Sequence, residues 1–98
     1  MDNAQKERLV VLAGEAAKVL AAITNALNNG LDTLHEETGA TAGEELEAAL
    51  GDFYFVANWM LSEGDILPDG VGTAMNTKQE RLVPILSHQG GTDDGPEE

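Results

Sequence analysis

The stretch LVVLAGEAAKVLAAITNAL, residues 9–27, is apolar at nearly every position and decides the fold. A cap at Asp2 or Asn3 and a left-handed stop at the Asn-Gly pair of residues 29–30 predict one long helix over about residues 5–28. Because this helix is apolar almost all round, a single neighbouring helix leaves part of its surface uncovered.

A second helix is predicted from the capping-box spacing of Thr41 and Glu44. It follows a polar loop over residues 31–40 and should end before Gly64. Its expected core face consists of apolar residues three or four positions apart. These residues are Leu46, Leu50, Phe53, Ala57, Met60 and Leu61.

Three large residues lie off that core face: Tyr54, Phe55 and Trp59. A single helical hairpin has one inner side, so these residues need another surface to cover them. We therefore expect a homodimer, or a dimer of dimers, in which two hairpins form a four-helix-bundle core with these residues as interface candidates.

A short third helix should follow the turn-rich connector GDILPDG, residues 64–70. Apolar residues recur at helical spacing from Val71 onward, and Pro84 should end or kink the helix. From Ser87 the composition is too polar to bury apolar area. The predicted organisation is one all-α domain over residues 1–86 and an acidic, disordered tail over residues 87–98.

The net charge of −13 on 98 residues restricts the possible partners. Residues 19–77 contain ten acids and neither Lys nor Arg. Phosphate binding requires basic side chains, so we expect no direct contact with nucleic acid or anionic lipid. Divalent cations, basic protein surfaces or plain solubility fit this charge.

A cytoplasmic protein is the simplest interpretation. The chain has no cysteine, and its first eight residues are polar, unlike a secretory signal. The apolar stretch carries Glu15 and Lys18, each of which costs about 2.5–3.5 kcal/mol at mid-membrane, so we predict no membrane span.

Two carboxylates stand out inside the predicted helices. Glu15 shares a helix face with Lys18, and Asp52 shares one with Ala49 and Glu45. If the helices pack antiparallel, these acids can meet in the interior, as in the oxygen-ligand metal sites of helical bundles.

A family resemblance is carried by residues 7–66, ERLVVLAGEAAKVLAAITNALNNGLDTLHEETGATAGEELEAALGDFYFVANWMLSEGDI. A weaker echo follows in residues 74–89, AMNTKQERLVPILSHQ. The chain resembles the MazG-like, all-α nucleoside triphosphate pyrophosphohydrolases, in the short version found in phage and prophage genomes. The resemblance implies cleavage of a triphosphate to a monophosphate and pyrophosphate, with Mg²⁺ held by the motifs E-E-x-x-E and E-x-x-D.

Carried over by position, the first motif falls on Gly14, Glu15 and Lys18, and the second on Ala49 and Asp52. Glu15 and Asp52 match the motifs, whereas Gly14, Lys18 and Ala49 are degenerate positions. Clustered carboxylates repel one another without a metal, and the Lys18 ammonium can take roughly the place of the cation and pair with Glu15 or Asp52. A protonated lysine offers no lone pair to a metal. The site therefore resembles a metal site that has lost its ability to bind the metal, which we call a retired metal site.

Three more residues are candidates for the site. Glu45 can complete a shifted metal site with Glu15 and Asp52. Lys78 and Arg81 can contact phosphate or can be solubilising charges.

Phe55 and Trp59 can stack on a base or pack in a core or interface. Asn58 can read a base edge or be a solvated amide. His35 and His88 have no ligand-like partner nearby in sequence, so we assign them no role.

Two functions remain open from the sequence. The first is a non-catalytic, acidic oligomer that inhibits a basic, nucleic-acid-binding host protein and needs no cofactor. The second is a Mg²⁺-dependent nucleoside triphosphate pyrophosphohydrolase with a rearranged metal site.

Overall fold

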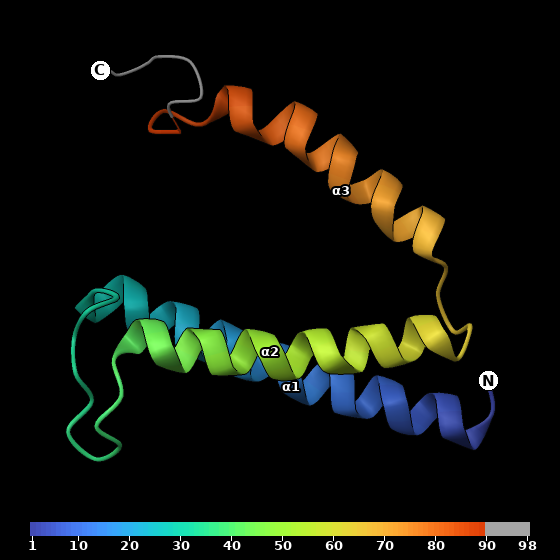
Figure 1. Ribbon diagram of the computed structural model, residues 1–98, viewed down its shortest axis with the longest axis horizontal. Coiled ribbons are helices and arrows are strands. Elements are labelled where there is room, and N and C mark those ends of the chain that lie inside the picture. The colour runs from blue at the N-terminus through green and yellow to red at the C-terminus, as the bar shows by residue number, and fades with distance from the viewer. Residues whose placement is uncertain (90–98) are drawn as a thin grey trace. The chain divides into compact units, whose positions relative to one another are not determined.

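The computed structural model describes residues 1–89, and this part of the chain is mainly helical. Its elements are α1 (Asn3–Asn29), α2 (Ala42–Ser62), α3 (Pro68–Leu82) and a short 3-10 turn, η1 (Val83–Ile85) (Figure 1). Across residues 1–89 the only β-type pairing is one isolated bridge, between Leu34 and Thr41. The predicted all-α class is confirmed.

The chain divides into two compact units, Met1–Asp65 and a second unit that begins at Ile66. The first unit is a hairpin in which α1 and α2 run side by side and antiparallel (Figure 1). The second contains α3 and η1. The predicted disordered tail, residues 87–98, lies mostly outside the described residues.

Both hairpin helices begin with a capping box. The Gln5 amide donates to Asp2 Oδ1 at 2.8 Å, and the Asp2 amide donates to Gln5 Oε1 at 3.0 Å. At α2 the Glu44 amide donates to Thr41 Oγ1 at 3.1 Å, and the Thr41 amide donates to Glu44 Oε1 at 2.8 Å. These reciprocal bonds satisfy amides that have no partner within the helix.

Glycines with positive φ follow both helices. Gly30 has φ 88° after α1, and Gly64 has φ 78° after α2. The Gly64 amide donates to the Leu61 carbonyl at 3.2 Å, and the Asp65 amide donates to the Met60 carbonyl at 2.9 Å. This pattern is a Schellman motif, which closes the helix and turns the chain toward Asp65.

The line of α2 that lies deepest against α1 differs from the predicted core face. Ala42, Ala49, Val56 and Met60 are the buried apolar residues among those described. Of the predicted face only Met60 is among them; the other five residues are half-buried. The helix is rotated so that small residues contact α1, because alanines on the contact line let the two backbones approach closely.

A buried ion pair closes the open end of the hairpin, which is the end opposite the interhelical loop. Arg8 Nε donates to Asp65 Oδ2 at 2.5 Å and its Nη2 donates to Asp65 Oδ1 at 2.9 Å. The side chains are 10% and 6% exposed. The hydrogen bonds from Arg8 lower the pKa of the Asp65 carboxyl below its usual range. The guanidinium also lies 5.8 Å from the centre of the Trp59 ring, a cation–π distance.

The third helix begins at Pro68, three residues before the first residue of its predicted stripe. Proline is favoured in the first helical turn because its missing amide would have no partner there. The α-helix ends at Leu82, and Pro84 lies in η1, as expected for a residue that cannot continue the helix.

By length and composition α1 also qualifies as a membrane-crossing helix. It is the one such helix among residues 1–89. Core helices of soluble proteins and signal sequences have the same properties, so this is weak evidence. Cytoplasmic localisation and the absence of a membrane span therefore stay predictions.

Candidate functional site

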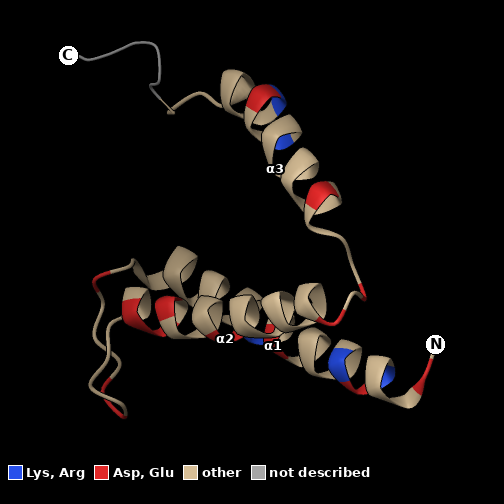
Figure 2. Cartoon of the chain, turned by 45° about the vertical axis from the view of Figure 1, so that its right-hand side comes forward, with Lys and Arg blue, Asp and Glu red and all other residues tan. Residues whose placement is uncertain are grey.

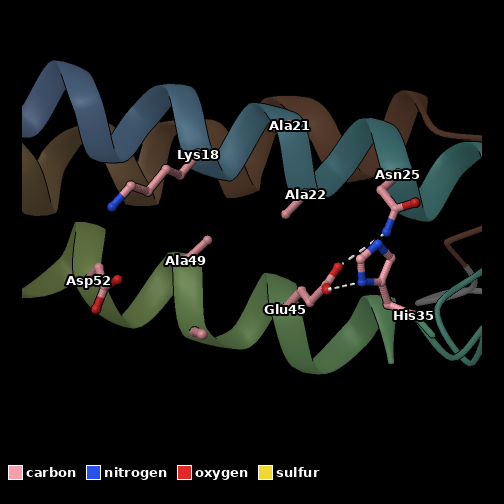
Figure 3. A pocket seen from close by; sticks show the side chains of 9 residues that line it. Lys18, Ala21, Ala22, Asn25, His35, Glu45, Ala49 and Asp52 are labelled. Carbon is pink, nitrogen blue, oxygen red and sulfur yellow. Dashed lines mark hydrogen bonds and ion pairs between the residues drawn. The ribbon is translucent and has the colours of Figure 1, made fainter. Parts of the chain in front are cut away.

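One flank of the hairpin holds a pocket of about 480 Å³ between α1 and α2 (Figure 3). Its floor is made by alanines of both helices, and polar side chains stand around them. The lining residues are Lys18, Ala21, Ala22, Asn25, His35, Glu45, Ala48, Ala49 and Asp52. Helical periodicity brings all of them except the loop residue His35 together, because each helix contributes residues that repeat every three or four positions.

Of the two acids expected as partners of Lys18, Glu15 and Asp52, the structure pairs it with Glu15. The Lys18 Nζ atom lies 3.4 Å from Glu15 Oε1. The lysine side chain is 64% exposed, whereas the glutamate side chain is 16% exposed. Glu15 Oε1 is buried and accepts no hydrogen bond from any described residue. The nearby ammonium is therefore the compensating charge for a carboxylate that is largely removed from water.

The second matching acid, Asp52, lines the same pocket as Lys18 (Figure 3). It is exposed, and Ala49, one turn before it, is 8% exposed and faces α1. Glu15 is not among the pocket-lining residues. Within residues 1–89 no group of three or more His, Asp or Glu side chains is arranged to hold a metal ion.

Glu45 also lines the pocket, but both its oxygens have protein partners. Asn25 Nδ2 donates to Glu45 Oε1 at 3.3 Å, and Thr38 Oγ1 donates to Glu45 Oε2 at 3.3 Å. The His35 Nδ1 atom lies 3.7 Å from the same Oε2 (Figure 3). Glu45 therefore ties the interhelical loop to both helices.

Two polar residues of the pocket, His35 and Asn25, were not predicted as site residues from the sequence. The loop folds back so that the His35 amide donates to the Ala40 carbonyl at 2.7 Å and the Gly39 amide donates to the His35 carbonyl at 2.8 Å. This turn points the ring at Glu45, ten positions further along the chain. Helical spacing gives no signal for such a contact, because the loop conformation creates it.

The aromatic candidates lie outside this pocket. Tyr54, Phe55 and Trp59 are 59%, 68% and 42% exposed. The Phe55 and Trp59 rings are 6.2 Å apart in a tilted arrangement, and Trp59 lines a separate cavity beside the start of α1. Asn58 is exposed and does not line the pocket. Their assignment as interface or base-reading residues stays a prediction.

Lys78 and Arg81 belong to the second unit. They line a cavity of about 400 Å³ on α3 and η1 together with Ala74, Thr77, Leu82 and Ile85. Each is exposed at the helix surface. A phosphate-binding role and a solubilising role both remain open for them.

Comparisons of the chain with protein-family models, with curated proteins and with solved structures gave no match. The MazG-like resemblance therefore depends on the residues quoted above.

Proposed function

We propose that this protein is a non-catalytic, MazG-like protein of phage type that acts by binding. It is an acidic oligomer whose hairpins associate into a four-helix bundle, and it inhibits a host protein by covering a basic, nucleic-acid-binding surface. The observation that carries the proposal is the ion pair between Lys18 Nζ and Glu15 Oε1, at 3.4 Å.

This ion pair supports a retired metal site for an electrostatic reason. A bound Mg²⁺ ion needs several oxygen ligands at close range, and its positive charge cancels the repulsion among them. Lys18 supplies positive charge beside Glu15 without any metal, and it would repel a cation entering the pocket. Ala49, at another of the three degenerate positions, supplies no ligand atom.

The distribution of charge supports a basic partner. The interhelical loop and the first half of α2 carry six acids and neither Lys nor Arg. These are Asp32, Glu36, Glu37, Glu44, Glu45 and Glu47. In Figure 2 red Asp and Glu segments lie along the loop and at the start of α2, whereas blue Lys and Arg segments lie near the start of α1. Complementary charge of this kind speeds association and makes it sensitive to salt.

The alternative function is a Mg²⁺-dependent nucleoside triphosphate pyrophosphohydrolase with a rearranged site. The observation in its favour is that Glu45 and Asp52 line the same pocket. Against it, the Glu45 oxygens already accept hydrogen bonds from Asn25 and Thr38. A metal at Glu45 would have to displace these donors.

Calorimetric titration with MgCl₂ separates the two functions. The protein is titrated alone and in the presence of a non-hydrolysable triphosphate analogue, with Glu45→Gln as the comparison variant. We expect no saturable heat from the unaltered chain in either condition. Saturable Mg²⁺ binding that Glu45→Gln abolishes would overturn the proposal and support the enzyme.

A further inference from the structure

Few apolar side chains are fully buried within the hairpin. Among residues 1–89 the buried apolar side chains are Ala42, Ala49, Val56 and Met60, and two of these are alanines. Small domains are marginal even when their cores are well filled. The two helices therefore leave a large apolar surface of the hairpin uncovered, including Leu20 and Leu27.

A continuous apolar line runs along the exposed surface of α1. Its members are spaced four and three residues apart in alternation, the heptad spacing of coiled-coil seams. They are Leu9, Ala13, Ala16, Leu20, Ile23 and Leu27. All six are exposed, Leu20 by 65% and Leu27 by 81%. The line of α1 that faces α2 is more polar than this one, since it contains Arg8 and Glu15.

A matching line runs along α2. It consists of Leu46, Leu50, Phe53, Ala57 and Leu61, which are the half-buried residues of the predicted core face. In each helix, members of the apolar line come one position after residues at the α1–α2 contact. Leu20 follows Val19 in α1, and Leu50 follows Ala49 in α2. One residue is a rotation of about 100°. When two helices are antiparallel, moving one residue along each chain from the helix contact leads to the same side of the pair. The two lines therefore share one flank of the hairpin.

We infer that this apolar flank is covered by the same flank of a second copy of the chain. The inference rests on the proposed association of hairpins and names its surface. The flank carries no Asp, Glu, Lys or Arg along either line, although the chain has a net charge of −13. Two copies that met through the other flank would place Glu45 and Asp52 of both chains at the interface. The apolar flank is the side on which two such acidic chains approach without that repulsion.

This geometry assigns different positions to the three aromatic candidates. Tyr54 follows Phe53 and lies at the edge of the apolar flank. Phe55 and Trp59 each precede a buried residue, Val56 and Met60, so they lie on the flank that bears the pocket. The pocket of Lys18 and Asp52 therefore stays open in the dimer.

A matched pair of substitutions tests this surface. Leu20→Glu and Val10→Glu introduce the same charge into the same helix at positions that are 65% and 71% exposed. Sedimentation equilibrium should give a dimer for the unaltered chain and for Val10→Glu, and a monomer for Leu20→Glu. A dimer for Leu20→Glu, or equal dissociation of both variants, would overturn the assigned flank while leaving association intact. A monomeric unaltered chain would overturn both.

A second measurement avoids variants that fail to fold. The chain has no cysteine, so Ala16→Cys on the flank and Ala17→Cys beside it each provide one reactive thiol. Maleimide labelling of Ala16→Cys should be slowed about tenfold when nine-tenths of the chain is dimeric, and dilution should restore the rate. Ala17→Cys should react quickly at every concentration. Equal labelling rates for both thiols would overturn the inference. Slow labelling of Ala16→Cys at every protein concentration would also overturn it, because the flank would then be covered by the same chain.

Discussion

The Arg8–Asp65 pair shows how one contact at the residue scale fixes the geometry of the hairpin. Its partners are 57 positions apart, so it joins the second turn of α1 to a residue three positions beyond the end of α2. Breaking a buried pair is costly because the remaining charge has no partner. The pair therefore holds the open end of the hairpin, as Glu45 holds the loop end.

Asp65→Asn should lower the melting temperature at neutral pH by several degrees. The pKa of Asp65 is lowered from its ordinary value of 3.8, so its stabilisation is complete above that value and is lost as the pH falls through the folded-state pKa. The difference in melting temperature between the two proteins should be constant above about pH 5 and should shrink below it. Melting curves from pH 3 to pH 7 measure this, and a difference that grows toward acid would contradict it.

At the element scale, the local sequence predicted where the helices begin and end better than it predicted which face of α2 packs against α1. The helix caps and the stop at residues 29–30 depend on residues that are close in sequence, so the sequence contains the whole signal. The contact line of α2 depends on which residues of α1 lie opposite it, and no local pattern specifies that choice. This is why Val56 and Ala49, rather than Leu50 and Leu61, lie deepest.

The turn after α2 predicts opposite effects for two glycine substitutions. Gly64→Ala should destabilise the protein by about 1 kcal/mol, because Gly64 has a positive φ that a side chain disfavours. Gly51→Ala should stabilise it by about 0.5–1 kcal/mol, since Gly51 lies inside α2 with open space for a methyl group. Urea denaturation of the two variants measures both values. Equal signs would show that the Schellman turn is wrongly described.

The interhelical loop provides a second test at this scale. His35→Ala should speed cleavage by a glutamate-specific protease after Glu36 and Glu37, because the ring beside Glu45 helps to hold the loop. His88→Ala is the matched control outside the hairpin. Limited proteolysis followed by mass spectrometry reports the sites and rates. Equal rates for both variants would show that His35 contributes nothing to loop order.

For the whole molecule, the sequence predicted the all-α class, and it left open whether Lys18 pairs with Glu15 or with Asp52. It could not predict that Glu45 is already engaged by the loop, because that contact requires the turn at Gly39 and Ala40. The sequence also leaves open which flank of the hairpin is covered, since both flanks carry large apolar residues.

The most direct test of the retired metal site is the Mg²⁺ dependence of the melting temperature. A ligand that binds the folded state raises it by mass action. The unaltered chain should melt at the same temperature with and without MgCl₂. The double variant Lys18→Glu, Ala49→Glu should melt lower than the unaltered chain without metal, because it adds two acids beside Glu15 and Asp52 and buries one of them. It should also gain stability as MgCl₂ is added. A Mg²⁺-dependent rise in the unaltered chain would contradict the account, because a site in which Lys18 has replaced the cation should not bind the metal.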